Sequence, residues 1–152
     1  MARIKIFYPE KTIYEHNVRV RIGDLSSSGH LAFDSLVGIL NDASAEFFLA
    51  NGIVRGNRNG QGVIYTELAV NYLNEAYYGD MLQIEIAVSD VGSKGFDLFF
   101  RVNSAEKEKV VAVAKIGVLF FDYQKGRAVK MPAQFRARIQ PVRQTTRGRR
   151  NL

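Results

Sequence analysis

The sequence predicts an α+β fold in which a curved antiparallel β-sheet wraps around one long central helix. One observation is the segment 33–50, whose apolar residues recur at helical spacing and cover most of its surface. The other is a succession of strand-like runs after residue 61, joined by short turns that favour antiparallel neighbours. We therefore expect the helix to fill the concave side of the sheet.

A first strand is predicted before the helix, over residues 14–22, because Val18, Val20 and Ile22 alternate to one face. The helix predicted over residues 33–50 leaves only a narrow polar strip, so we expect protein to surround it on most sides. Its expected apolar positions are Phe33, Leu36, Val37, Ile39, Leu40, Ala43, Ser44, Phe47, Phe48 and Leu49.

The ends of this helix carry recognisable signals. Asp34 or Ser35 could cap its first turn, and Asn51 followed by Gly52 could end it.

Four further strands are predicted after the helix, and short turns separate them. The strands are "VIYTELAVNYL", "MLQIEIAVSDV", "FDLFFRVNS" and "VVAVAKIGVLFFDY". The turns between them are "YYGD", "GSKG" and "AEKEK", and "QKGR" closes the last strand. Such short connections predict an antiparallel meander. There is no internal repeat, so we expect one domain over residues 1–140.

Composition excludes several classes of site. The 152-residue chain has no cysteine and only two histidines, which rules out disulfides, thiol catalysis and Cys-ligated zinc, and we predict no metal or cofactor. No apolar run is long enough for a membrane helix, and the N-terminus lacks the pattern of a secretion signal. We therefore expect a cytoplasmic protein that does not enter membranes.

The net charge of +6 is concentrated near the C-terminus, where residues 136–150 hold six arginines and no acid. We predict that residues 141–152 form a basic, disordered tail. Nucleic-acid binding is not favoured, because no aromatic residue follows Phe135 to stack on bases.

Two stretches resemble a known family: "GDLSSSGH" followed by Phe33, and "YLNEAYYGD" at residues 72–80. Over roughly residues 12–135 the chain resembles the hotdog-fold acyl-CoA thioesterases, in particular the 4-hydroxybenzoyl-CoA thioesterase branch. The resemblance implies hydrolysis of a thioester of CoA or acyl carrier protein. It also implies a homodimer or a dimer of dimers, with sheets joined edge to edge and the substrate at the interface.

The resemblance assigns roles within the loop at residues 21–30. Asp24 matches the family's structural Asp, Gly29 its Gly, and His30 a His that many members carry. The amide of Phe33 is the implied donor to the thioester oxygen. Ser26, however, stands where the family has its catalytic carboxylate.

This departure matters because a serine hydroxyl needs a neighbouring base, whereas a carboxylate is already ionised at neutral pH. A grouping of Ser26, His30 and Asp24 is conceivable. Spacing of four residues in a loop fixes no geometry, however, and a lone histidine in a turn more often bonds to the backbone.

Other carboxylates are alternatives to the missing one. We favour Glu67, on a strand that lines the family's acyl site, over Asp34 and Glu46. Two of them also have a structural interpretation: Glu67 as an exposed or cross-strand paired residue, and Asp34 as a helix cap. Glu46 is harder to explain in this way, because an acid on a wrapped helix must find a partner or be exposed.

Substrate contacts are predicted beside these groups. Gly29, Asp34 and Thr66 are candidates near the acyl group. Lys94 matches a basic position that the family uses near the nucleotide, and Arg127 and Lys130 follow the last long strand. Lone surface cations are more often only solvated. Two functions therefore stay open: a thioester hydrolase with an atypical site, or a non-catalytic module that binds an acyl thioester or a protein.

Overall fold

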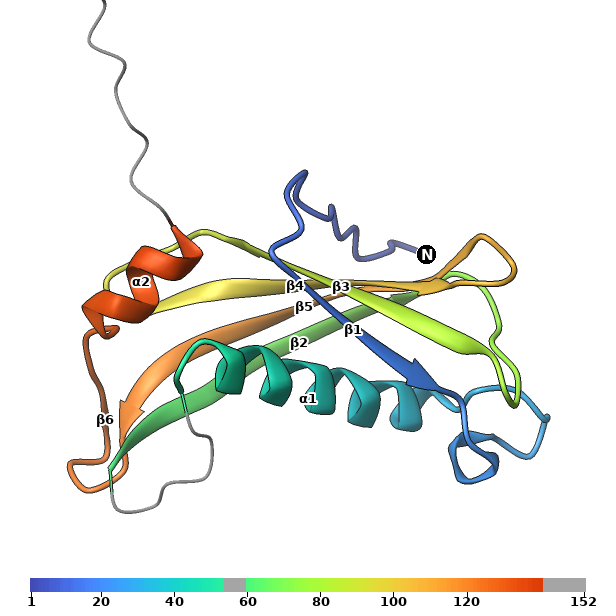
Figure 1. The fold of residues 1–152 in the computed structure, drawn as a ribbon, viewed down its shortest axis with the longest axis horizontal. Coiled ribbons are helices and arrows are strands. Elements are labelled where there is room, and N and C mark those ends of the chain that lie inside the picture. Colours follow the sequence, from blue (N-terminus) through green and yellow to red (C-terminus); the bar gives the residue numbers. More distant parts are fainter. Residues whose placement is uncertain (54–59, 141–152) are drawn as a thin grey trace, which may run out of the picture.

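A computed structural model of the chain, which describes residues 1–53 and 60–140, shows one antiparallel sheet curved around a long helix (Figure 1). The strands lie in the order β1-β3-β4-β5-β2, and the short β6 pairs with β5. The elements are β1 (Tyr14–Arg19), α1 (Phe33–Ala50), β2 (Gln61–Tyr72), β3 (Met81–Ser89), β4 (Gly95–Ser104), β5 (Lys109–Asp122), β6 (Arg127–Ala128) and α2 (Ala133–Ile139). The predicted α+β class, with a curved antiparallel sheet around one long helix, is confirmed.

The meander is confirmed for β3, β4 and β5, but the predicted hairpin between β2 and β3 is wrong. β2 pairs with β5, and β3 pairs with β1 and β4. The turn before β3 is bound to the end of β1 instead. The Gly79 N–H donates to the Val20 carbonyl and the Val20 N–H donates to the Asp80 carbonyl, both at 2.9 Å. Residues 73–80 therefore lead from β2, at one edge of the sheet, to β3, which lies beside β1 at the other edge.

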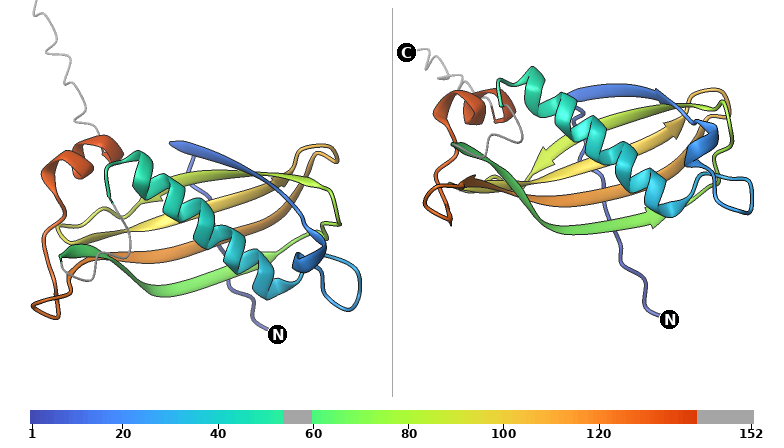
Figure 2. Two further views of the ribbon diagram at one scale, coloured as in Figure 1. Left: turned by 60° about the horizontal axis from the view of Figure 1, so that its bottom comes forward. Right: turned by 90° about the horizontal axis from the view of Figure 1, so that it is seen from below.

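The core lies between α1 and the concave face of the sheet (Figure 2). Every second residue of β4 is buried, and on α1 the buried side chains include Leu36, Leu40 and Phe47. The other side of the helix is open in a single chain, where Phe33 is 72% exposed and Leu49 is 59% exposed. The expected burial of α1 on most sides is thus wrong for one chain, because a single sheet covers only one side.

The two ends of α1 differ from each other. Its N-cap is Ala32, and no side chain caps it, so the expected cap by Asp34 or Ser35 is wrong. Asp34 Oδ1 instead accepts the adjacent Ser35 N–H at 2.9 Å. The C-terminal end is as predicted, since Asn51 caps it and Gly52 follows in the left-handed region, with φ of +80°.

The short helix α2, which the sequence did not suggest, closes the core beside the end of α1. Its Phe135 side chain is buried and lies 5.2–6.2 Å, between ring centroids, from Phe47, Phe48, Phe96 and Phe120. The predicted basic tail, residues 141–152, lies outside the described residues. Within the described ranges, no helix is long and apolar enough to cross a membrane.

The packing of α2 gives a stability prediction. Phe135→Ala should lower the free energy of unfolding by about 3–5 kcal/mol, because it removes a fully buried ring from an aromatic cluster. The matched control is Phe7→Ala, whose ring is 79% exposed and whose loss should cost under about 0.5 kcal/mol. Urea denaturation measures both, and equal effects would show that α2 does not stabilise the core.

Candidate active site

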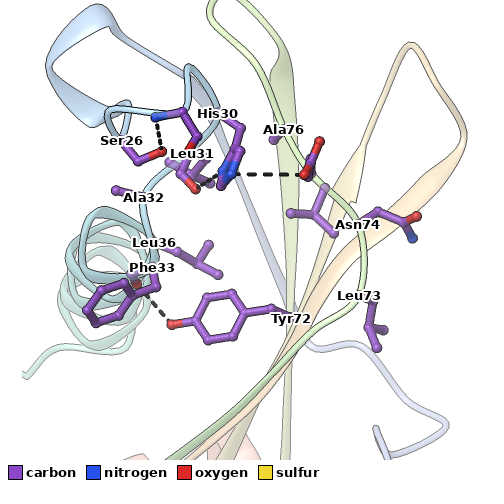
Figure 3. A pocket seen from close by; sticks show the side chains of 13 residues that line it. Ser26, His30, Leu31, Ala32, Phe33, Leu36, Tyr72, Leu73, Asn74 and Ala76 are labelled. Atoms are coloured by element: carbon purple, nitrogen blue, oxygen red, sulfur yellow. Dashed lines mark hydrogen bonds and ion pairs between the residues drawn. The ribbon is translucent and has the colours of Figure 1, made fainter.

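A cavity of about 420 Å³ lies at the N-terminal end of α1 (Figure 3). Its wall comes from two parts of the chain: the loop that leads into the helix, and the segment that follows β2. The lining residues are Ser26, Ser28, His30, Leu31, Ala32, Phe33, Leu36, Tyr72, Leu73, Asn74, Glu75, Ala76 and Val111. The cavity is therefore mostly apolar, with a few polar groups at its wall, as is typical of small-molecule sites.

Asp24 holds the loop in shape. Its carboxylate accepts the Arg21 N–H at 2.8 Å and the Arg21 guanidinium at 3.2 Å, while its carbonyl accepts the Ala32 N–H at 2.9 Å. Burial by itself would raise the pKa of Asp24, but the hydrogen bonds from Arg21 outweigh it and leave the pKa below its usual value. Asp24 is thus an ionised structural group bound to Arg21.

Gly29 allows the tight turn in this loop. Its φ of +83° lies in the left-handed region, which glycine adopts without a steric penalty. The Gly29 N–H donates to the Ser26 carbonyl at 3.0 Å, and the Ser26 N–H donates to the His30 carbonyl at 2.8 Å. These bonds place Ser26 and His30 on the cavity wall.

The side chains of Ser26 and His30 have separate partners. Ser26 Oγ accepts the Ser28 N–H at 3.2 Å. His30 Nδ1 lies 3.1 Å from the Leu31 carbonyl oxygen, and Nε2 lies 3.9 Å from Glu75 Oε1. Because Asp24 is bound to Arg21, the conceivable grouping of Ser26, His30 and Asp24 is not assembled here.

The start of α1 continues the wall that the loop forms. Since the side chain of the N-cap residue Ala32 does not cap it, the Phe33 N–H is available to a ligand at the positive end of the helix dipole, while Asp34 Oδ1 accepts the Ser35 N–H. The Tyr72 hydroxyl donates to the Phe33 carbonyl at 2.9 Å, which holds that ring beside the helix. Burial and the charge of Asp34 raise the pKa of Tyr72, so it stays a donor.

Glu67 does not reach this cavity in a single chain. It lies opposite Gly117 on β5, while the neighbouring Ile116 and Val118 are the residues that face the helix. Its carboxylate therefore projects from the convex face, where it bonds to Lys115 Nζ at 2.5 Å. This bond, and a second one to Asp97, raise the pKa of Lys115.

The remaining predicted acyl contacts lie apart from one another. Thr66 is the extra residue of a β-bulge and lines a separate groove of about 530 Å³ between β2 and α1. Asp34 is exposed at the first turn of α1, and Glu46 is exposed toward the other end of that helix.

The predicted phosphate contacts lie at the opposite end of the molecule from the cavity. Lys94 is in the turn between β3 and β4, and Arg127 and Lys130 follow β5, all near the C-terminal end of α1. The helix is about 27 Å long at 1.5 Å per residue, so these cations are remote from the cavity of the same chain.

Sequence reasoning missed the charged groups that do lie beside the cavity. Lys107 and Lys109, from the "AEKEK" hairpin, line a neighbouring groove of about 490 Å³ that shares Leu73, Asn74 and Glu75 with the cavity. Glu75 was missed although it sits inside the "YLNEAYYGD" motif. Glu75 could have been identified as a candidate because it is the acid near the start of this motif, which the resemblance places at the site.

A family model described as the thioesterase-like superfamily matches residues 20–139. A curated relative, the L-carnitine dehydrogenase/betainyl-CoA thioesterase of Rhizobium meliloti, is 23% identical over 127 residues, which is 83% of this chain. The chain spans about a quarter of the length of that relative (26%).

Solved structures resemble the whole fold. A 1,4-dihydroxy-2-naphthoyl-CoA thioesterase from Synechocystis has a TM-score of 0.77 at 13% identity, covering 85% of this chain and 96% of the other. A putative thioesterase from Pseudomonas aeruginosa has a TM-score of 0.79 at 19% identity, covering 84% and 98%. A Staphylococcus aureus protein in complex with CoA has a TM-score of 0.77 at 16% identity, covering 89% and 85%. The likeness confirms the predicted hotdog fold.

The role of Asp24 predicts a pH-dependent stability. Asp24→Asn should lower the free energy of unfolding at pH 7 by about 1–3 kcal/mol, because the Arg21 N–H and guanidinium lose the charged acceptor that the buried Asp24 supplies. The folded pKa is depressed, so the stabilisation is full above the unfolded pKa of about 3.9 and is lost as the pH falls through the lower folded pKa. Urea denaturation at several pH values should therefore show the difference from wild type shrinking below about pH 4.

The control is Glu10→Gln, which removes an exposed carboxylate. A difference between wild type and Asp24→Asn that stays constant down to pH 2 would contradict the depressed pKa.

Proposed function

Because the chain belongs to the thioesterase-like superfamily, we propose that it hydrolyses an acyl thioester of CoA or of acyl carrier protein in the cavity at the start of α1. The observation that carries the proposal is the uncapped helix N-terminus, which opens onto a mostly apolar cavity. The acyl group would occupy the apolar part, and the thioester oxygen would face the Phe33 amide. Such donors act where charge develops, and each is worth about 3–4 kcal/mol in the transition state.

The site is atypical because Ser26 replaces the expected carboxylate. A serine hydroxyl with no base bound to it is a poor nucleophile, and the Ser26 oxygen accepts only a backbone N–H in the described contacts. This favours attack by water over a covalent acyl–serine intermediate. The same observation supports the second candidate, a module that binds acyl thioesters without hydrolysing them.

A homodimer is part of the proposal, because β2 is an open edge of the sheet. Leu68 and Tyr72 of β2 are about half exposed, and the groove beside them is walled by Val37 and Gly38 of α1. A second copy that pairs with this edge would cover the apolar side chains. Dimerisation in the same way would also enclose the cavity, which Tyr72 borders.

Substitutions at Ser26 test the hydrolase. Release of thiol from acetyl-, hexanoyl- and benzoyl-CoA measures turnover. Ser26→Ala should change kcat by less than about threefold, because an unactivated hydroxyl contributes little to attack. Ser26→Asp should raise kcat by about 10²-fold if its carboxylate meets the thioester in register.

The controls separate the two candidate functions. Calorimetric titration with CoA measures binding without turnover, and tightly bound acyl-CoA that is never hydrolysed would establish the binding module instead. A large loss in Ser26→Ala would contradict attack by water.

The dimer is tested by a charge at the β2 edge. The wild-type protein should sediment at twice the 17.1 kDa mass of the chain, and Leu68→Glu should shift it toward the monomer by placing a carboxylate in the apolar contact. Analytical ultracentrifugation at micromolar concentration measures both. The control is Glu46→Leu on the exposed side of α1, and a wild-type monomer would contradict the proposal.

A further inference from the structure

We propose that His30 and Glu75 together bind and activate the attacking water, in place of the carboxylate that is absent at position 26. This inference rests on the proposed hydrolase function. Both residues line the cavity at the start of α1, and they come from its two separate walls. The distance between them is 3.9 Å, from His30 Nε2 to Glu75 Oε1.

The tautomer of His30 follows from its backbone contact. Nδ1 lies 3.1 Å from the Leu31 carbonyl oxygen, which can only accept a hydrogen bond. Nδ1 therefore carries the proton, and in the neutral ring Nε2 is an acceptor with a free lone pair. That lone pair is directed to the side where Glu75 lies.

Nε2 and Glu75 Oε1 are thus two acceptors separated by 3.9 Å, too far for a direct hydrogen bond. A water molecule ~2.8 Å from each would donate one proton to each, because the two directions would meet at about 88°, which bends each hydrogen bond by only about 10°. Its lone pairs would then point away from both acceptors. Such a water is both oriented and made more nucleophilic.

Glu75 is fixed in this position by a second bond. The Tyr77 hydroxyl donates to Glu75 Oε2, which leaves Oε1 for the side of His30. The same hydrogen bond is the main cause of the raised pKa of Tyr77, so the tyrosine stays protonated. Tyr77 is therefore a positioning residue for the carboxylate.

Backbone pairing fixes the separation of the two walls. The Leu31 N–H donates to the Ala76 carbonyl at 2.8 Å, and His30 forms a bridge with Tyr77. The imidazole is on a residue of this bridge, and the carboxylate is on Glu75, which is adjacent in the sequence to the paired Ala76. Their side chains remain 34% and 59% exposed, so water and a thioester can reach them.

The reaction balances with these groups alone. The water oxygen attacks the thioester carbon, one water proton moves to His30 Nε2, and the carbonyl electron pair moves to the oxygen that faces the Phe33 amide. Glu75 stabilises the imidazolium. When the C–S bond breaks, the carbonyl re-forms and the imidazolium returns the proton to the leaving sulfur, giving a thiol and a carboxylic acid.

The test compares turnover and binding in matched variants. Glu75→Gln and His30→Gln should each lower kcat by about 10²–10⁴-fold for the acyl-CoA that the wild type hydrolyses best, while CoA affinity measured by calorimetry stays within about threefold. The double variant should be about as slow as either single variant, because the two groups act on one water. The matched control is Glu106→Gln, an exposed carboxylate at the β4–β5 turn, which should retain wild-type kcat.

Chemical rescue separates catalysis from structure. Imidazole should restore part of the turnover of His30→Ala, which a purely structural role would not allow. Tyr77→Phe, which leaves the carboxylate in place, should lower kcat by about tenfold and provides a second test if Glu75→Gln does not fold.

The outcomes distinguish the two levels of the proposal. A wild-type protein that hydrolyses neither the acyl-CoAs nor the same acyl groups on acyl carrier protein overturns the proposed function and this inference with it. Active wild type with undiminished Glu75→Gln and His30→Gln overturns only the water-activating pair. A loss confined to Glu67→Gln would also overturn it, and would assign the carboxylate to the residue that the sequence favours.

Discussion

The lengthwise packing of α1 on the concave face of the sheet is the constraint on which the rest of the molecule depends. Leu36, Leu40 and Phe47 are almost completely buried against the strands, so the helix cannot slide or rotate without exposing them. At roughly 2 kcal/mol for each such side chain, displacement costs more than the local contacts of the loop can supply. The position of the helix N-terminus is therefore set by the core, and the loop and the residues after β2 are arranged around it.

The two walls of the cavity depend on backbone hydrogen bonds more than on side-chain packing. Asp24 binds the start of the loop to Arg21 and, through its carbonyl, to Ala32, while Leu31 pairs with Ala76 of the crossing segment. Residues 73–80 reach the helix N-terminus only because they cross the sheet instead of forming a hairpin. The crossover is thus what brings His30 and Glu75 to one cavity.

The sequence predicted the parts that periodicity determines. Helical spacing over residues 33–50 and alternation in the strands gave the helix, the strands and the fold class, because burial imposes those periods. The pairing of β2 was not predictable in this way, since a short turn signal does not say which strand lies beside it. The helix α2 was missed because its apolar residues, Phe135 and Ile139, stand among arginines in a short segment.

The site residues show a sharper limit. The resemblance pointed to the loop at residues 21–30 and to Phe33, which line the cavity, but it did not point to Glu75, the acid in the cavity wall. Glu67 and Glu75 are both glutamates, and the amino-acid sequence alone does not show which of them lies at the cavity. The β-bulge between Tyr65 and Glu67 changes which residues face the helix, and Glu67 then projects from the convex face toward Lys115. A bulge of one residue leaves no clear mark in an amino-acid pattern, yet it decides on which face of the sheet Glu67 lies.

Ala32 connects the stability of the helix to its proposed chemistry. A Ser, Thr or Asp at this N-cap would stabilise α1 by about 1 kcal/mol, because its side chain would accept an N–H of the first turn. That side chain would accept the N–H of Asp34 or Ser35, and it would bring its oxygen into the space beside the Phe33 amide that a thioester oxygen has to enter. With alanine at the cap, no side-chain oxygen of residue 32 competes for the space beside the Phe33 amide, and the core, rather than a cap, holds the helix in place. The stability lost at the cap is small compared with the stabilisation of about 3–4 kcal/mol that one backbone N–H donor contributes when negative charge develops beside it.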